Sequence, residues 1–179
     1  MEQFKSEQDP KKEKPTMLYH GSQEKRLREL HPQMENVRNQ EEGALVFGTP
    51  DKAFAIMYLS PRPNDSWSMK LKPDDEWHFI IGDKERFVNG DNGGSIYTMS
   101  SKEFECDEGK GMGKTEWHSQ KSIPLTREED YPSTLQALIE NGVRVYFVDK
   151  EKLCELKKAI EKSKDDYAAI LQSLQSETL

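Results

Sequence analysis

The sequence predicts an α+β fold, in which antiparallel strands and helices occupy different stretches of one chain. Residues 66–99 hold short apolar and β-branched runs separated by turn residues, a pattern typical of antiparallel sheet. Residues 133–141 and 150–175 instead carry apolar side chains at helical spacing. The length of 179 residues suits a single domain of ordinary size. We therefore expect antiparallel strands with flanking helices and a long C-terminal helix.

Composition narrows the class of protein. The net charge of -7 argues against nonspecific binding of nucleic acid, which needs a basic surface, although a local pocket can still hold a nucleotide. The two cysteines, Cys106 and Cys154, form no CxxC motif and fit a reducing compartment. No apolar run approaches the roughly 18 residues that a membrane span needs, and the start of the chain is polar. We therefore expect a cytoplasmic protein with no membrane partner.

The first folded segment is expected at residues 17–22. Residues 1–16 are charged and hold few apolar side chains, so we predict a disordered tail ahead of a domain at residues 17–149. The apolar start of the segment predicts a buried strand, and Gly21 lets a ligand approach the backbone closely.

The next elements follow from local patterns. We expect a short helix or turn, a strand and a helix, in that order, at residues 23–33, 44–47 and 50–58. Pro50 suits a first helical turn, and either Thr49 or Asp51 can cap the helix. Further strands are predicted at residues 66–71, 77–81, 86–88, 95–99 and 116–123. Residues 101–114 are polar and contain glycines, so we expect a mobile loop there.

The C-terminal third has the clearest pattern. A helix at residues 133–141 precedes a buried strand at 143–148, and Asp149 caps a helix that runs to about residue 175. A heptad stripe marks this helix: Leu153, Ile160, Tyr167 and Leu174, with Leu156 and Ile170 at the second position. Two interpretations stay open, because the amphipathic segment of residues 150–179 can pack on its own domain or form a homodimer seam.

Several apparent motifs lack residues that their functions require. Residues 109–115 resemble a phosphate-binding P-loop, but Glu108 stands where that motif needs its first glycine, and the pattern that follows is not helical. The four histidines form no i, i+4 pair and adjoin no cysteine cluster, so we expect no metal. Cys106 has no activating base nearby in sequence, which argues against a thiol nucleophile.

Three short motifs occur in an order that suggests a family. The motifs are Tyr19-His20-Gly21-Ser22, Phe47 with Tyr58 eleven residues later, and Glu116-Trp117. Together they resemble the His-Tyr-Glu signature of the ADP-ribosyltransferase superfamily, in the branch of diphtheria toxin and the poly-ADP-ribose polymerases. The resemblance extends over residues 17–148, through these three motifs alone.

The resemblance implies a fold of split antiparallel sheets, with NAD as cosubstrate and no metal. It implies that His20 bonds the ribose on the adenosine side and that the backbone of Gly21 pairs with the nicotinamide carboxamide. Phe47 and Tyr58 would sandwich the nicotinamide ring, and Glu116 would bond the 2′-hydroxyl of the nicotinamide ribose. Catalysis is thus assigned to Glu116, and cofactor binding to His20, Gly21, Ser22, Phe47 and Tyr58.

The chemistry of these residue types agrees with that assignment. Cleavage of the bond between ribose and a cationic nicotinamide builds positive charge on the sugar, which a carboxylate stabilises in the transition state. Aromatic rings hold a flat cation by stacking. Each residue also has an ordinary explanation: His20 at a strand end, Phe47 and Tyr58 in a core, and Glu116 as a solvated carboxylate. Because the motifs occur together and in order, we expect them to face one another, joined by the strand at 143–148.

We therefore predict an NAD-dependent mono-ADP-ribosyltransferase whose acceptor is an unknown protein or nucleic acid. Phe47 stands where the family has tyrosine, so the alternative is a noncatalytic NAD-binding module that uses the C-terminal helix as an interaction arm. A relative of the RNA 2′-phosphotransferases is a third possibility, which the acidic balance of the chain opposes. The polar loop at residues 101–114 precedes Glu116 and is the expected contact with the acceptor.

Overall fold

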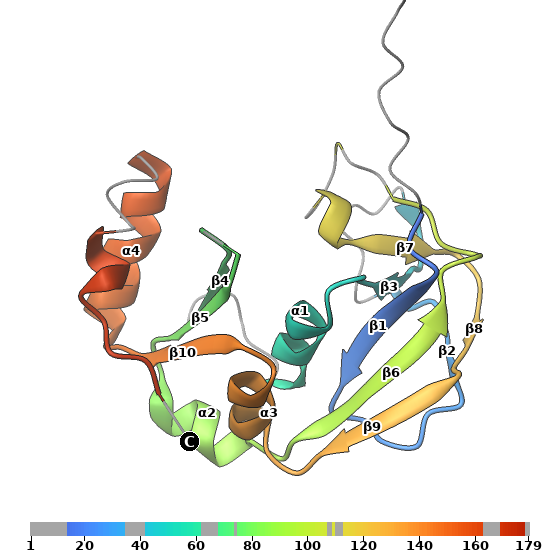
Figure 1. Cartoon of the computed structure of the whole chain (residues 1–179), viewed down its shortest axis with the longest axis horizontal. Coiled ribbons are helices and arrows are strands. Elements are labelled where there is room, and N and C mark those ends of the chain that lie inside the picture. Colours follow the sequence, from blue (N-terminus) through green and yellow to red (C-terminus); the bar gives the residue numbers. More distant parts are fainter. Residues whose placement is uncertain are drawn as a thin grey trace, which may run out of the picture.

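The structure is a computed structural model that describes residues 14–34, 42–61, 68–73, 75–106, 109, 113–162 and 169–177. Two sheets lie on opposite sides of a pair of helices, α1 (Lys52–Ile56) and α3 (Thr134–Glu140), as Figure 1 shows. A further helix, α4 (Lys150–Lys162), covers the outer face of one sheet. The chain is therefore of the mixed α+β class, as the sequence predicts.

The first sheet has the strand order β1-β6-β9 and is antiparallel throughout. Strands β1 (Met17–Ser22) and β9 (Arg127–Tyr131) flank the central β6 (Gly94–Ser100). The sequence pattern does not predict β9, because its residues Arg-Glu-Glu-Asp-Tyr show no apolar alternation. Backbone pairing to β6 holds this strand, and its charged side chains suit an exposed sheet edge.

The second sheet has the order β10-β5-β4 and is mixed. Strand β4 (Ser68–Leu71) runs antiparallel to β5 (Trp77–Ile81), but β10 (Val143–Phe147) runs parallel to β5. The expectation of purely antiparallel sheets is therefore wrong for this pair. All five residues of β5 are buried, because helices cover both faces of the strand.

Two further sheets have two strands each: β2 (Glu29–Leu30) with β8 (Ile123–Pro124), and β3 (Val46–Gly48) with β7 (Trp117–Ser119). The segment at residues 23–33, expected as a helix or turn, is instead irregular and contains β2, and Gln33 forms a β-bridge with Leu45. The single strand expected at residues 116–123 is divided into β7 and β8, because a bend at residues 120–122 separates them.

The helices predicted at residues 50–58 and 133–141 are confirmed. The first consists of α1 followed by a 3₁₀ turn, η3 (Met57–Leu59), and its N-cap is Asp51. The second is α3, whose N-cap is Ser133. A further 3₁₀ turn, η4 (Gly113–Thr115), precedes β7.

The strand predicted at residues 86–88 is wrong, since helix α2 (Lys84–Gly90) occupies this segment. Asp83 caps the helix, and its side chain accepts a hydrogen bond from the backbone N–H of Arg86 at 3.0 Å. Phe87 is the buried side chain of α2 and anchors it to the core. The cap and this single anchor outweigh the β propensity of the Phe-Val pair.

The C-terminal helix packs on its own domain. The buried side chains of α4 are Leu153, Leu156 and Ala159, and they form one cluster with Ile80 of β5, Tyr146 of β10 and the later residue Leu171. Residues 163–168, including Tyr167 of the heptad stripe, lie outside the described residues. Residues 169–172 are helical, and the backbone N–H of Glu177 donates to the carbonyl of Val145 at 2.8 Å. The homodimer seam stays a prediction.

The end of the predicted N-terminal tail contacts the domain. Lys14 Nζ donates hydrogen bonds to the carbonyl oxygens of Lys102 and Phe104, at 3.1 and 2.7 Å. Residues 1–13 lie outside the described residues. The tail therefore meets the first part of the loop that was expected to contact the acceptor.

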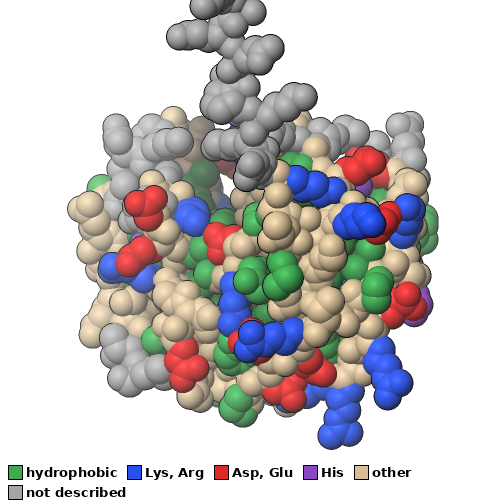
Figure 2. All heavy atoms as spheres, turned by 45° about the vertical axis from the view of Figure 1, so that its right-hand side comes forward, with side chains coloured by type: hydrophobic (Ala, Val, Ile, Leu, Met, Phe, Trp, Pro, Cys, Tyr) green, Lys and Arg blue, Asp and Glu red, His purple; other side chains and the backbone are tan. Residues whose placement is uncertain are grey.

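One face of the molecule displays mixed charge. Figure 2 shows acidic and basic side chains interspersed over this face, with hydrophobic side chains exposed between them. Among the helices that the structure describes, none combines the length and apolarity needed to cross a membrane.

Candidate functional site

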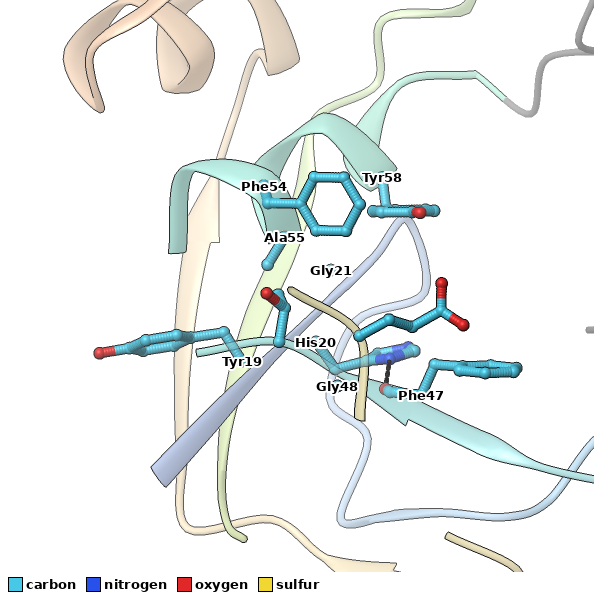
Figure 3. A pocket seen from close by; sticks show the side chains of 10 residues that line it. Tyr19, His20, Gly21, Phe47, Gly48, Phe54, Ala55 and Tyr58 are labelled. Atoms are coloured by element: carbon cyan, nitrogen blue, oxygen red, sulfur yellow. Dashed lines mark hydrogen bonds between the residues drawn. The ribbon is translucent and has the colours of Figure 1, made fainter. Parts of the chain in front are cut away.

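A cavity of about 240 Å³ opens between β1, β3 and the segment α1–η3. A cavity of this size is large enough for several water molecules or for one substituted aromatic ring. Figure 3 shows the side chains around the cavity. Its lining residues are Tyr19, His20, Gly21, Phe47, Gly48, Thr49, Phe54, Ala55, Tyr58 and Glu116.

Most of the predicted site residues share this cavity: His20, Gly21, Phe47, Tyr58 and Glu116. Ser22 does not, because it ends β1 outside the cavity, where its hydroxyl accepts a hydrogen bond from the backbone N–H of Glu24 at 3.1 Å. Strand β10 corresponds to the strand that was expected to face the site. It belongs to the second sheet and contributes none of the described lining residues. That expectation is wrong.

Backbone pairing brings the three motifs together. Tyr19 and Thr49 exchange two backbone hydrogen bonds, of 2.7 and 3.0 Å, which place β1 beside the end of β3. Strand β3 in turn pairs with β7, with Gly48 opposite Trp117. Glu116 immediately precedes β7, so this register carries its side chain to the cavity that His20 lines.

The imidazole of His20 is held by the backbone of Phe47. Nδ1 lies 2.9 Å from the Phe47 carbonyl oxygen, and because a carbonyl can only accept, Nδ1 carries the proton. Burial lowers the pKa of the imidazole below its ordinary 6.5, and the bond to Phe47 offsets this only in part. The ring is therefore neutral at pH 7, and Nε2 presents an acceptor lone pair.

Gly21 is required by helix packing. A Cβ at this position would lie 2.1 Å from the carbonyl oxygen of Ala55 and 3.0 Å from its carbonyl carbon. The missing side chain therefore allows α1 to pack directly on β1, which differs from the ligand approach that the sequence suggests. The backbone of Gly21 still lines the cavity beside Ala55.

Aromatic rings form much of the cavity lining, and those of Phe54, Tyr58 and Phe47 lie on its apolar side. Phe54 and Tyr58, one helical turn apart, meet edge to face with ring centroids 5.3 Å apart, and Phe54 stacks on Trp77 at 4.8 Å. Tyr58 remains 49% exposed at the mouth of the cavity, whereas Phe54 is buried. Figure 3 shows the Phe47 and Tyr58 rings edge-on at the same side of the cavity, one above the other. This arrangement suits a planar ligand held between aromatic faces.

Glu116 supplies the negative charge of the site. Among the described residues that line the cavity it is the one carboxylate, and none is lysine or arginine. Its Oε1 is shielded from solvent, and its backbone N–H donates to the carbonyl of Gly113 in η4 at 3.0 Å. A carboxylate among aromatic rings and a neutral histidine favours a planar or cationic ligand.

The helix that carries Tyr58 is fixed by its capping residue. Asp51 accepts hydrogen bonds from the backbone N–H of Phe54 at 3.2 Å, Nε1 of Trp77 at 2.7 Å and Nζ of Lys72 at 3.0 Å. Burial alone would raise the pKa of Asp51, but these bonds outweigh it and hold the pKa below 3.8. The cap thus joins α1 to the second sheet.

Some lining residues were not found from the sequence. Phe54 is the most informative, since its i, i+4 spacing to Tyr58 on a predicted helix is a usable signal. The sequence suggests Thr49 as a helix cap, and in the structure its backbone also pairs with Tyr19. The loop that resembles a P-loop leads through η4 into a strand, as its pattern indicated. In the described part of the chain, no group of three or more His, Cys, Asp or Glu residues is placed to hold a metal ion.

Comparisons with known proteins gave no match to a family model, to a curated protein or to a solved structure.

Proposed function

We propose that this protein is an NAD-dependent mono-ADP-ribosyltransferase with the split-sheet fold of that superfamily. One observation carries the proposal: His20, Phe47, Tyr58 and Glu116 come from three distant segments and line one cavity. The arrangement of two separate sheets around α1 and α3 supports the fold assignment. The proposed setting is the cytoplasm.

The cavity residues fit the nicotinamide end of NAD. Phe47 and Tyr58 offer aromatic faces to the ring, and the cavity is large enough to admit that ring. The backbone of Gly21 is exposed to the cavity and can pair with a carboxamide. Nε2 of His20 accepts a hydrogen bond from a ribose hydroxyl, because Nδ1 is engaged by Phe47.

In the proposed reaction, Glu116 accepts a hydrogen bond from the 2′-hydroxyl of the nicotinamide ribose. The bond between C1′ and the ring nitrogen breaks, its electron pair leaves with nicotinamide, and the ribose gains positive charge. The Glu116 carboxylate stabilises that charge more in the transition state than in the bound reactant. An acceptor nucleophile then bonds to C1′ and releases its proton.

The acceptor is proposed to approach along β7. Residue Glu105 of the loop at 101–114 exchanges backbone hydrogen bonds of 2.8 and 2.9 Å with His118 of β7, two residues after Glu116. A second cavity of about 350 Å³ lies there, and its charged lining includes Lys14, Lys102, Lys121, Glu103 and Glu105. A polar cavity beside the catalytic strand is a suitable place for a protein or nucleic-acid acceptor.

The alternative is a noncatalytic NAD-binding module. Phe47 favours it, because a phenylalanine keeps the stacking surface but lacks the hydroxyl of the family tyrosine. The second part of this alternative is a helical interaction arm, and the packing of α4 on β5 and β10 argues against it. The absence of lysine and arginine from the described lining of the first cavity also weighs against an RNA 2′-phosphotransferase, which must hold phosphate.

The test is nicotinamide release. Purified protein is incubated with NAD labelled in the nicotinamide ring, with and without a cell lysate as acceptor source, and labelled nicotinamide is separated and counted. Release supports the enzyme. If calorimetry shows NAD binding but no acceptor yields nicotinamide release, the noncatalytic module replaces the enzyme. If the protein neither binds NAD nor releases nicotinamide, both proposed functions are refuted.

A further inference from the structure

Two lysines, Lys70 on β4 and Lys72 just after it, lie beside a cluster of three aromatic rings. Lys70 of β4 places Nζ 3.6 Å from the ring centroid of Tyr58 and 5.8 Å from that of Phe54. Lys72, two residues later, places Nζ 5.2 Å from the ring of Trp77 and pairs with Asp51 at 3.0 Å. The rings of Trp77, Phe54 and Tyr58 therefore form a continuous cluster with an ammonium group near each end.

Lys70 lies against the Tyr58 ring but is not part of the described cavity lining. Tyr58 itself lines the cavity. Figure 1 shows α1, which leads into the η3 turn that carries Tyr58, between β4 on one side and β1 and β3 on the other. The ammonium group thus approaches from outside the cavity.

A cation on one face of an aromatic ring changes what the other face can bind. The negative face of the ring attracts a cation, and a second cation on the opposite face is repelled by the first through the ring. A neutral ring stacked on that face experiences little of this repulsion. Lys70 therefore disfavours a positively charged ring in the cavity relative to a neutral ring of the same shape.

We propose that Lys70 acts through Tyr58 to favour departure of nicotinamide, an inference that rests on the proposed transferase function. The nicotinamide ring of NAD is positively charged while it is bonded to C1′. When that bond breaks, the electron pair neutralises the ring and the positive charge moves to the ribose, next to Glu116. Lys70 destabilises the positive charge on the nicotinamide ring before the bond breaks, and Glu116 stabilises the positive charge that then forms on the ribose.

Lys70 is therefore a positioning residue, which acts on the charge of the substrate through Tyr58 and need not contact the substrate. Replacing it with methionine keeps much of the side-chain length and removes the charge. We expect kcat for nicotinamide release to fall about tenfold in Lys70→Met, with no increase in KM for NAD, since repulsion of the bound reactant is also removed. Lys70→Arg, which keeps the cation, should restore kcat.

The decisive experiment measures ring binding and needs no turnover. Nicotinamide and the cation 1-methylnicotinamide are titrated separately into full-length wild-type protein and into Lys70→Met, Lys70→Arg and Lys72→Met, with NMR shifts giving each Kd. The Kd of 1-methylnicotinamide divided by the Kd of nicotinamide should fall about tenfold in Lys70→Met and stay unchanged in Lys70→Arg. Lys72→Met is the matched control and should also keep the wild-type ratio.

Each other outcome has a definite meaning. An unchanged ratio in Lys70→Met would overturn the role of Lys70 and leave the transferase proposal intact. An equal gain in affinity for both rings would place the Lys70 side chain over the cavity face of Tyr58, which also overturns it. If neither ring binds the wild-type protein, the cavity is not a nicotinamide site, and the proposed function fails together with this inference.

Discussion

His20 and Phe47, 27 residues apart in the chain, are joined by a hydrogen bond of 2.9 Å between Nδ1 of the imidazole and the Phe47 carbonyl oxygen. The bond connects the first strand to the strand that presents one aromatic wall of the cavity. The bond engages Nδ1 of the imidazole in the fold and leaves Nε2 as the nitrogen that can accept a hydrogen bond from a ligand. Substitutions can separate these two roles.

Asparagine at position 20 tests the ligand role of His20. The Asn amide can still donate to the Phe47 carbonyl, but it lacks an acceptor in the position of Nε2. We expect His20→Asn to weaken NAD binding about tenfold, equivalent to one lost hydrogen bond. Calorimetry gives the affinity, and His20→Ala, which removes both groups, should also reduce stability. Wild-type affinity in His20→Asn would contradict the assigned role.

The stability of the protein should depend on the protonation of His20. Burial lowers the pKa of the folded imidazole below 6.5, so the unfolded state binds more protons as the pH falls. Stability is therefore fully present above about pH 6.5 and decreases as the pH falls below it. Urea unfolding at pH values between about 7 and 5 should show a shallower decrease for His20→Asn than for wild type. Equal slopes would mean that His20 is not buried in its neutral form.

Gly21→Ala tests the contact between α1 and β1. The new Cβ would lie 2.1 Å from the carbonyl oxygen of Ala55, so the helix must shift. We expect a loss of about 1–3 kcal/mol in the free energy of unfolding. The adjacent Ser22→Ala is the control and should change stability by less than about 0.5 kcal/mol. It should also leave NAD affinity unchanged, since Ser22 lies outside the cavity.

Asp51→Ala should cost more stability than the removal of an ordinary cap. Asp51 caps α1 and also binds Trp77 and Lys72, so we expect a loss of about 2–3 kcal/mol. Asp83→Ala, which removes a cap of α2, should cost about 1 kcal/mol. Urea unfolding compares the two variants, and equal losses would show that the bonds to Trp77 and Lys72 contribute little.

The contribution of Asp51 also has a defined pH dependence. Because its folded pKa lies below 3.8, its stabilising effect is present above that pH and is lost as the pH falls through the folded value. The difference in stability between wild type and Asp51→Ala should therefore shrink in acid. A difference that stays constant below pH 3.8 would contradict the lowered pKa.

Glu116→Gln tests the proposed chemistry. The amide keeps the shape of the side chain but cannot offset positive charge on the ribose. We expect kcat for nicotinamide release to fall about 10²- to 10³-fold, with KM for NAD changed only a few-fold. Glu140→Gln, at an exposed position of α3 outside both cavities, is the matched control. Activity equal to wild type in Glu116→Gln would exclude the assigned role.

Much of the fold follows from local patterns. The helices at residues 50–58 and 133–141 have apolar spacing and capping residues that act within a few positions, so the sequence alone predicts them. Helix α2 and strand β9 were not predicted, for opposite reasons. The first holds a Phe-Val pair with strand propensity whose fate depends on the Asp83 cap, and the second holds charged residues that are a strand only because β6 pairs with them.

The candidate site divides in the same way. The motifs at His20, Phe47, Tyr58 and Glu116 and their order were visible in the chain, because residue type and spacing are local properties. That these residues line one cavity depends on the pairing of β1, β3 and β7, which joins segments far apart in sequence.

Two further features of the site arise only from long-range packing. The Ala55 carbonyl explains the absence of a side chain at Gly21, and β4 brings the charge of Lys70 to the Tyr58 ring. Contacts of this kind have no local signature, since they depend on how helix α1 lies between two sheets. They exist once the chain has packed, and they set the environment in which the local motifs act.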